Sequence, residues 1–400
     1  MKLSNNRFKY TLILALVFSF LQGQSFRLKS PDNLVIAADR PGAYLAALYG
    51  KKIGLVVNHS STLVDGKHLV DFLLESNIQV VKIFSPEHGF RGEASAGAKV
   101  ESGKDPKTGL PVISLYGKRR KPLPEDMAGL DLVIFDIQDV GARFYTYIST
   151  LTYVMEAAAE NKVSVMVFDR PNPHGYYIDG PILDLKHKSF VGMHPVPVIH
   201  GMTVGEYAKM VNGEGWLRGG IHCDLEVVPC LNYDHRTAYE LPIKPSPNLP
   251  NAHAVSLYPS LCFFEGTPVS VGRGTKLPFQ IIGAPWFTEY ANTFTPVDRP
   301  GATNPPFEGQ ICKGFELTDF AASYMDGLGE LYLYWLVEAY NIAPDKEIFF
   351  KPFFTLLAGT TELQNQIEAG KSPEEIRSSW EPGLRAFQQM RRRYLLYPDF

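Results

Sequence analysis

Two apolar stretches decide the fold: residues 131–137 read DLVIFDI and residues 163–169 read VSVMVFD. Near-continuous apolar runs of this length are typical of strands that are covered on both faces of a sheet. The alanine-rich residues 150–161 between them predict a helix. A strand, a helix and a second strand in this order predict a parallel sheet with right-handed crossover connections.

The same alternation extends towards the N-terminus, where residues 52–58, 78–84 and 112–116 predict further strands and residues 63–75 predict a helix. The fold class expected from this order is α/β, with a doubly wound parallel sheet. A chain of 400 residues exceeds the size of one hydrophobic core, so we expect a second domain. Residues 330–340 and 381–395 predict helices in that domain.

The segment 241–250, LPIKPSPNLP, carries four prolines in ten residues. Proline excludes this segment from a helix interior and from a central strand, so the segment should be extended. We interpret it as the linker between the two domains.

The first 25 residues have the pattern of a secretory signal peptide. Lys2, Arg7 and Lys9 precede a short apolar run at 12–21, and Gly23 and Ser25 are spaced as at a cleavage site. The run is shorter than the roughly 20 residues that span a bilayer. We therefore expect an exported protein, periplasmic or extracellular, that does not span the membrane once the signal is removed.

Composition and missing motifs exclude several functional classes. With 39 Lys and Arg against 42 Asp and Glu, the net charge of −3 gives no reason to expect a nucleic-acid partner. Motifs for dinucleotide binding, P-loop phosphate binding, zinc proteases and serine hydrolases are absent. The four cysteines form no C-x-x-C pair, and the histidines lack metal-ligand spacing, so we expect no metal, no cofactor and no essential disulfide.

Polar residues gather after the predicted strands, where open α/β sheets bind their ligands. A further apolar run at 196–199 is also followed by a polar residue, His200. Solvated loops are the alternative explanation for such residues. The candidates at these ends are Asn58, His59, Glu87, His88, Arg91, Asp136, Gln138, Asp139, Arg143, Tyr145, Asp169, Arg170, Asn172 and His200.

The second domain contributes one dense segment, CFFEGTPVSVGRGT at 262–275. Glu265 follows two phenylalanines, and burial beside them would raise its pKa towards that of a general acid. Alternatively, its carboxylate accepts backbone hydrogen bonds in a tight turn. Arg273 and Thr275 lie in a glycine-flanked loop that suits an anion. Carboxylates combined with aromatic side chains suit glycoside hydrolysis.

Five strings, in order, resemble the NamZ-type exo-β-N-acetylmuramidases. They are SPEHGFRGEASAG (85–97), FDIQDVGARFYTY (135–147), FDRPNP (168–173), HGMTVGE (200–206) and the segment 262–275. The resemblance runs from about residue 50 to the end. It implies a Rossmann-like N-terminal domain, a smaller C-terminal α/β domain and an active-site cleft between them. It also implies release of N-acetylmuramic acid from the non-reducing end of peptidoglycan fragments.

The resulting division of the chain is a signal peptide at 1–25, a Rossmann-like domain at 26–240, a proline-rich linker at 241–256 and a C-terminal domain at 257–400. We expect Glu87 to be the leading catalytic carboxylate and Glu265 its partner or a substrate clamp, with Asp136 in reserve beside Asp139 and Asp169. Arg91, Arg143, Arg170 or Arg273 could pair with the lactyl carboxylate of the sugar. A muropeptide-binding protein without turnover, and an amidase or esterase acting on wall fragments, remain the alternatives.

Overall fold

The computed structural model describes residue 28 and residues 32–86, 90–91 and 103–400. Its N-terminal half is a seven-stranded sheet with the order β3-β4-β2-β1-β5-β6-β7, parallel except at the β3–β4 edge. This sheet confirms the predicted fold class. The strands are β1 (Ile53–Val57), β2 (Val80–Ser85), β3 (Gly103–Lys104), β4 (Pro111–Ser114), β5 (Leu132–Asp136), β6 (Ser164–Phe168) and β7 (Leu225–Val228).

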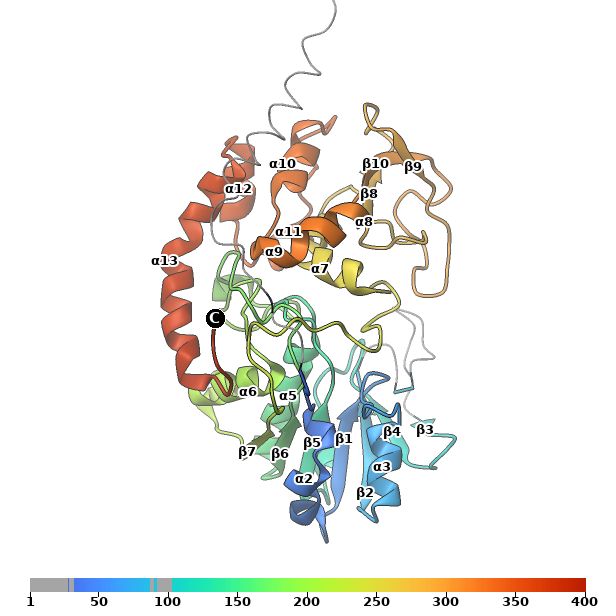
Figure 1. The fold of residues 1–400 in the computed structure, drawn as a ribbon, viewed down its shortest axis with the longest axis vertical. Coiled ribbons are helices and arrows are strands. Elements are labelled where there is room, and N and C mark those ends of the chain that lie inside the picture. Colours follow the sequence, from blue (N-terminus) through green and yellow to red (C-terminus); the bar gives the residue numbers. More distant parts are fainter. Residues whose placement is uncertain (1–27, 29–31, 87–89, 92–102) are drawn as a thin grey trace, which may run out of the picture.

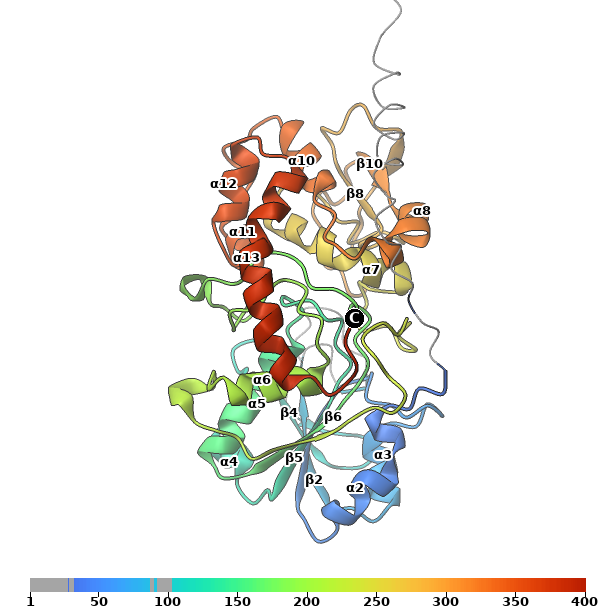
Figure 2. The same ribbon diagram turned by 60° about the vertical axis from the view of Figure 1, so that its left-hand side comes forward.

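Helices cover both faces of this sheet, which is why its central strands are apolar throughout (Figure 2). One face packs on α2 (Pro41–Leu48) and α3 (Leu69–Glu75), and the other on α5 (Tyr147–Glu160) and α6 (Val204–Gly213). Successive side chains of β5 point to opposite faces of the sheet. Val133 and Phe135 pack in the core on one face, and Leu132 and Ile134 pack in the core on the other. The short helix α4 (Pro124–Met127) precedes β5.

Two predicted elements differ from the structure, and one strand of the sheet was not predicted. Helix α3 begins only at Leu69, because His68 forms its N-cap and accepts a hydrogen bond from the backbone of Val70. The run 196–199 is not a strand of the sheet and makes only isolated bridges. The seventh strand is instead β7, whose half-exposed residues lack the apolar pattern that marks the central strands.

The C-terminal half combines helices with a three-stranded antiparallel sheet of order β8-β10-β9. Helix α7 begins at Ala252, so the last five residues of the linker range 241–256 are helical. The segment 241–250 is not extended throughout, because residues 246–249 form a turn in which the Leu249 backbone donates to the Ser246 carbonyl at 3.1 Å. The elements are α7 (Ala252–Leu261), β8 (Ile281–Ala284), β9 (Asn292–Phe294), β10 (Cys312–Glu316), α8 (Thr318–Phe320), a π-helical turn (Ala321–Met325), α9 (Asp326–Leu328), α10 (Tyr334–Asn341), α11 (Pro352–Ala358), α12 (Glu362–Glu368) and α13 (Pro373–Arg391). Short 3-10 turns lie at Ala37–Asp39, Leu185–His187, Arg218–Gly220, Cys262–Gly266 and Arg392–Tyr394.

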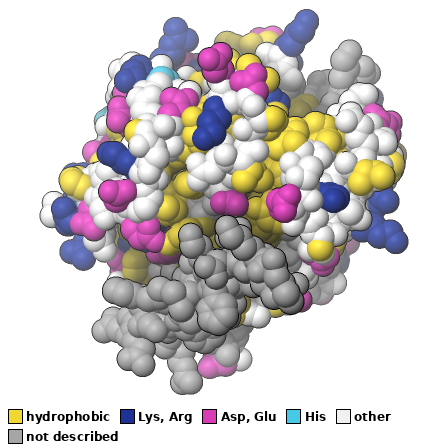
Figure 3. Space-filling model, turned by 90° about the horizontal axis from the view of Figure 1, so that it is seen from above, with side chains coloured by type: hydrophobic (Ala, Val, Ile, Leu, Met, Phe, Trp, Pro, Cys, Tyr) yellow, Lys and Arg dark blue, Asp and Glu magenta, His cyan; other side chains and the backbone are white. Residues whose placement is uncertain are grey.

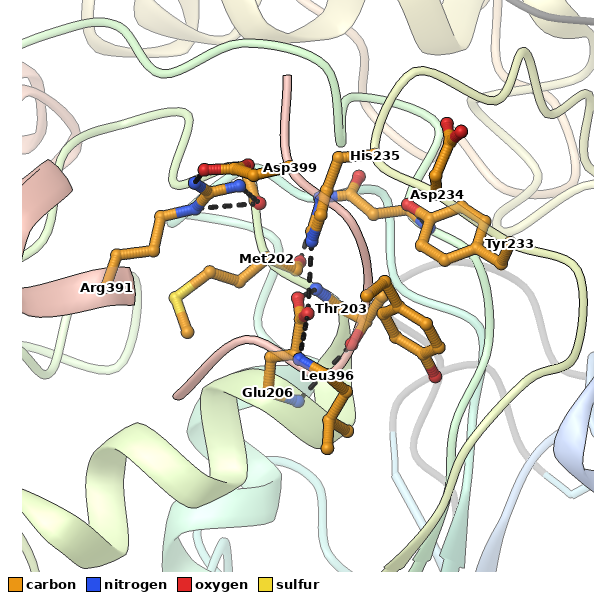
Figure 4. A network of polar contacts seen from close by, with 12 residues as sticks. Met202, Thr203, Glu206, Tyr233, Asp234, His235, Arg391, Leu396 and Asp399 are labelled. Carbon is orange, nitrogen blue, oxygen red and sulfur yellow. Dashed lines mark hydrogen bonds and ion pairs between the residues drawn. The ribbon is translucent and has the colours of Figure 1, made fainter. Parts of the chain in front are cut away.

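Helix α13 runs from the C-terminal half back to the N-terminal half, and the last residues pack there (Figures 1 and 2). Arg391, fully buried at the end of α13, donates to the backbone carbonyl of Gly201 and pairs with Asp399. The carboxylate of Glu206 accepts from the Leu396 backbone at 2.8 Å and lies 3.0 Å from the His235 ring nitrogen (Figure 4). The end of the range 257–400 is therefore held against the N-terminal half by a buried polar network.

Within the described part of the chain, no helix has the length and apolarity needed to cross a membrane. The predicted signal peptide, residues 1–25, lies entirely outside the described residues. All four cysteines are buried and unpaired.

Candidate active site

A cavity of about 420 Å³ lies between the two halves of the molecule. Its volume falls in the range of about 300–1,000 Å³ that is usual for small-molecule sites. The N-terminal half, the segment before α7 and the C-terminal half all contribute to its wall. The described residues that line it are Phe144, Tyr145, Thr146, Tyr147, Val191, Ser246, Asn248, Leu249, Tyr258, Glu265, Arg273, Phe279 and Phe353.

The sheet topology explains why the N-terminal wall lies here. The strand order reverses at β1, whose neighbours are β2 and β5, so the loops after β1 and β5 diverge at a topological switch point. The loop after β5 leads to Tyr145 and Tyr147 on the cavity wall. The Asn58 side chain, directly after β1, donates a hydrogen bond of 2.9 Å to the Tyr147 hydroxyl. The two strand ends thus fix this wall together.

Glu265 and Arg273 form an ion pair on the opposite wall. The Glu265 carboxylate accepts from Arg273 Nε at 2.7 Å and lies 2.6 Å from Nη2. Burial lowers the pKa of Arg273, but the Glu265 carboxylate outweighs burial and raises this pKa above its ordinary value. Both side chains keep some exposure, 23% for Glu265 and 29% for Arg273, so both can meet a ligand.

The environment of Glu265 differs from the one expected from its two preceding phenylalanines. Phe263 and Phe264 are fully buried in the core, and the group that the Glu265 carboxylate contacts is the Arg273 guanidinium. A carboxylate held in such an ion pair is already engaged as a hydrogen-bond acceptor. The geometry therefore favours the role of partner or substrate clamp over that of general acid.

Aromatic rings form the rest of the wall. Tyr145 packs edge-to-face against Tyr147 and Tyr258, with ring centroids 5.1 and 5.8 Å apart. The Arg273 guanidinium lies over the Phe279 ring at 5.2 Å from its centroid. Phe353 is 40% exposed although it is fully apolar. Apolar rings beside a charged pair suit a ligand with both apolar faces and polar substituents, as sugars have.

Asp136 and Arg170 meet each other away from the cavity. Asp136 ends β5 and binds Arg170 through two hydrogen bonds of 2.5 and 2.9 Å. Both are nearly inaccessible, with 0% and 3% of their side chains exposed. This arrangement favours a structural role at the strand end for both residues.

Arg143 is also fully buried, and its guanidinium donates to four backbone carbonyls. Two of these belong to residues 181 and 196, and two to residues 357 and 358 in α11. Arg143 therefore joins the halves of the molecule, and no donor atom of it lines the cavity.

Gln138, Asp139 and His200 surround a second, very small void. Burial raises the pKa of Asp139 to about 7 and lowers that of His200 to about 3. Asp139 Oδ1 accepts from the Gly141 backbone, while its Oδ2 lacks a partner. These groups are sealed beneath the loop after β5 rather than brought to the cavity.

The remaining predicted residues each have a partner, and among them only Asn172 lines the small void, together with Gln138, Asp139, Arg170 and His200. They are His59, bonded to the Lys244 carbonyl; Arg91, paired with Asp105 and Asp71; Asp169, bonded to Tyr397 and Thr203; Asn172, bonded to the Met202 carbonyl; and Thr275, bonded to the Gly272 carbonyl. Of the predicted site, the structure brings Tyr145, Glu265 and Arg273 together at the cavity, with Asn58 behind Tyr147. Glu87 and His88 lie outside the described residues.

Sequence reasoning missed several lining residues, notably Tyr147, Ser246, Asn248 and Phe353. Ser246 and Asn248 lie in the segment that was interpreted only as a linker. Their one available signal was that two polar residues alternate with prolines, which restrict the backbone to few conformations. Phe353 carries no local signal, because nothing in sequence separates an aromatic residue at a rim from one in a core.

Among the residues that the structure describes, no group of three or more His, Cys, Asp or Glu side chains could hold a metal ion. The face of the C-terminal half shown in Figure 3 carries acidic and basic side chains interspersed among apolar ones. That face therefore has no single-sign field of the kind that attracts a polyanion.

The fold and the cavity define a class: a two-domain, Rossmann-like α/β protein whose interdomain cavity suits a small polar ligand. Comparison with known families identifies which family within this class the chain matches. Residues 53–253 match the N-terminal domain of the exo-β-N-acetylmuramidase NamZ, and residues 256–397 match its C-terminal domain. The chain belongs to this family.

Individual relatives agree with that assignment. The chain is 41% identical to the peptidoglycan β-N-acetylmuramidase NamZ of Bacillus subtilis, over 92% of this chain and 94% of that protein. A crystal structure of a DUF1343 family protein from Bacteroides fragilis superimposes with a TM-score of 0.86 at 48% identity, covering 92% of this chain and all of the other. A second such protein from that organism gives 0.77 at 29% identity, over 91% and 99% of the two chains.

Proposed function

We propose that this protein is a glycoside hydrolase that releases N-acetylmuramic acid from the non-reducing end of peptidoglycan fragments. Family membership supplies the reaction class. The observation that carries the proposal is the interdomain cavity, in which Glu265 and Arg273 face a wall of tyrosines. A carboxylate, a cation and aromatic rings in one cavity match a sugar that carries its own carboxylate.

Glycoside cleavage requires an acid at the leaving oxygen and a second carboxylate that acts as base or nucleophile. We propose Glu87 as the leading catalytic carboxylate, because it follows β2 by two residues within the family motif SPEHGFRG. Glu265 is its partner or a clamp for the substrate. Arg273 pairs with the lactyl carboxylate, since its Nε and Nη2 already bind Glu265 and leave Nη1 for a second anion.

A pair of chromogenic glycosides tests the function. The purified protein should release the chromophore from the N-acetylmuramic acid glycoside and much less from the N-acetylglucosamine analogue, which lacks the lactyl group. Glu87→Gln should lower kcat by about 10²–10⁴-fold. A wild-type protein that binds the muramic acid glycoside without turnover would be a binding protein instead. Release of peptide or lactate, rather than free N-acetylmuramic acid, would indicate an amidase or esterase.

We also propose that the protein is exported to the periplasm or cell exterior and acts in cell-wall turnover. The signal-peptide pattern of residues 1–25 supports this. Mass spectrometry of the secreted protein should find an N-terminus near residues 24–26. Intact Met1 in a cytosolic fraction would contradict export.

A further inference from the structure

The proline-rich segment before α7, residues 244–251, is held by both halves of the molecule. His59 bonds to the carbonyl of Lys244 at 2.9 Å, and the Tyr145 hydroxyl donates to the carbonyl of Pro245 at 2.8 Å. On the other side, Asn248 Nδ2 donates to the carbonyl of Gly301 at 2.8 Å. The segment is thus a fixed part of the cavity wall, and a free tether would have none of these bonds.

The backbone at Gly301 explains part of this rigidity. Gly301 has a φ of +90°, and a Cβ there would lie 2.6 Å from the Pro247 ring. Only glycine allows such an approach, so the loop at 301 packs directly on the segment. Ser246 and Asn248 flank Pro247 and line the cavity, and both are more than nine-tenths buried.

The hydrogen bonds of Ser246 and Asn248 leave each side chain with one group that can bind a ligand. Asn248 must turn its Nδ2 towards the Gly301 carbonyl, which leaves Oδ1 as an acceptor, and Oδ1 has no partner within the described structure. Ser246 Oγ accepts a 3.2 Å bond from the Asn248 backbone, while its own hydrogen is donated to no group there. One acceptor and one donor therefore lie on the cavity wall, on side chains that are otherwise buried. A ligand that enters the cavity displaces water from both groups, so a ligand that pairs with both is favoured.

We propose that Ser246 and Asn248 recognise the 2-acetamido group of the bound sugar, an inference that rests on the proposed function. An acetamido group has one N–H donor and one carbonyl acceptor. Asn248 Oδ1 accepts from the N–H, and the Ser246 hydroxyl donates to the carbonyl. The two residues then select for the N-acetyl group, while Arg273 selects for the lactyl group.

Binding measurements separate this role from a structural one. Calorimetric titration would use free N-acetylmuramic acid and its analogue with a hydroxyl at C2, 3-O-lactylglucose. The wild type should prefer the acetamido sugar. Ser246→Ala and Asn248→Ala should each weaken binding of N-acetylmuramic acid about tenfold and leave binding of the analogue nearly unchanged, so that the preference shrinks.

Asn251→Ala is the matched control. Asn251 lies in the same segment, caps α7 by accepting from Ala254, and donates to Gln280, but it does not line the cavity. Its loss should lower the melting temperature without altering the preference. Because Ser246→Ala removes only one oxygen atom, it keeps the test open if Asn248→Ala fails to fold.

The outcomes separate this inference from the proposed function. An unchanged preference in Ser246→Ala and Asn248→Ala, or equal loss for both sugars, would overturn the inference even if the enzyme is active. A wild type that shows no preference would overturn it as well. A preference that shrinks in a protein without turnover would uphold the acetamido site and overturn the hydrolase.

Discussion

Two arginine–carboxylate pairs in this molecule have similar contact distances and opposite surroundings. Asp136 and Arg170 are sealed at the end of β5, whereas Glu265 and Arg273 keep about a quarter of their side chains exposed in the cavity. Both pairs were candidates on sequence grounds. The comparison teaches that a polar residue at a strand end becomes a binding group only if the loops above it leave it accessible, and the loop after β5 does not.

The largest effect that distinguishes the pairs should come from Glu265→Gln. Removal of a carboxylate that acts in the reaction should lower kcat about 10²–10⁴-fold. Stability should change little, because a partly exposed ion pair contributes only about 1 kcal/mol or less. Steady-state kinetics and urea unfolding of the same preparation would measure both. Near-normal turnover in this variant would remove Glu265 from the reaction.

Asp136→Asn should give the opposite pattern. It leaves Arg170 buried without its counter-charge, which typically costs about 3–5 kcal/mol of unfolding free energy. At temperatures where the variant stays folded, its turnover should be close to that of the wild type. Glu381→Gln is a suitable control, because Glu381 forms an exposed pair with Arg385 on α13. A stable but inactive Asp136→Asn protein would mean that the sealed pair takes part in catalysis.

Arg273→Ala should act on specificity. If Arg273 holds the lactyl carboxylate, loss of that charge-assisted bond should cost roughly 1.5–3 kcal/mol for the muramic acid substrate only. The readout is the ratio of kcat/KM for the N-acetylmuramic acid and N-acetylglucosamine glycosides, with the exposed Arg385→Ala as control. An unchanged ratio would exclude Arg273 from this role.

A pH-dependent effect concerns Asp139, which is buried within the same loop after β5. Its pKa is about 7 in the folded protein and about 4 in an unfolded chain, because burial disfavours the charged form. Between these values the folded chain keeps a proton that the unfolded chain releases, so stability falls as pH rises from about 4 to 7.

Asp139→Asn should remove that loss, because Asn stays neutral and keeps an acceptor for the Gly141 backbone. Urea unfolding from pH 4 to 8 would measure this difference. The unfolding free energy of the variant should rise relative to that of the wild type by up to about 1.4 kcal/mol per pH unit, with no further rise above pH 7. Parallel curves for the two proteins would show that Asp139 is ionised in the fold.

Sequence periodicity predicted the central strands well, because strands covered on both faces must be apolar throughout. Edge strand β7 was not predicted, because its residues are half-exposed and need not be apolar throughout. The dense segment 262–275 and the family resemblance both pointed to Glu265 and Arg273, which lie eight residues apart and form an ion pair. Neither could separate them from Asp136 and Arg170, because accessibility depends on loops packed from distant parts of the chain.

The proline-rich segment shows the same limit of prediction from local sequence. Its composition predicted an extended path, but residues 246–249 form a turn in which the Leu249 backbone donates to the Ser246 carbonyl at 3.1 Å. Proline fixes its own φ at a value that suits a turn as well as an extended chain, so composition did not separate the two. Its place in the cavity wall arises from bonds to residues about 50 to 185 positions away, Gly301 and His59 among them. No local pattern encodes those contacts.

A crystal structure of the wild-type protein with N-acetylmuramic acid would test the central claim most directly, namely that the interdomain cavity is the working site. The account predicts the sugar in this cavity, with its lactyl carboxylate at Arg273 and its acetamido group between Ser246 and Asn248. A sugar bound outside the cavity, or held there with its carboxylate and acetamido group turned away from these residues, would contradict it.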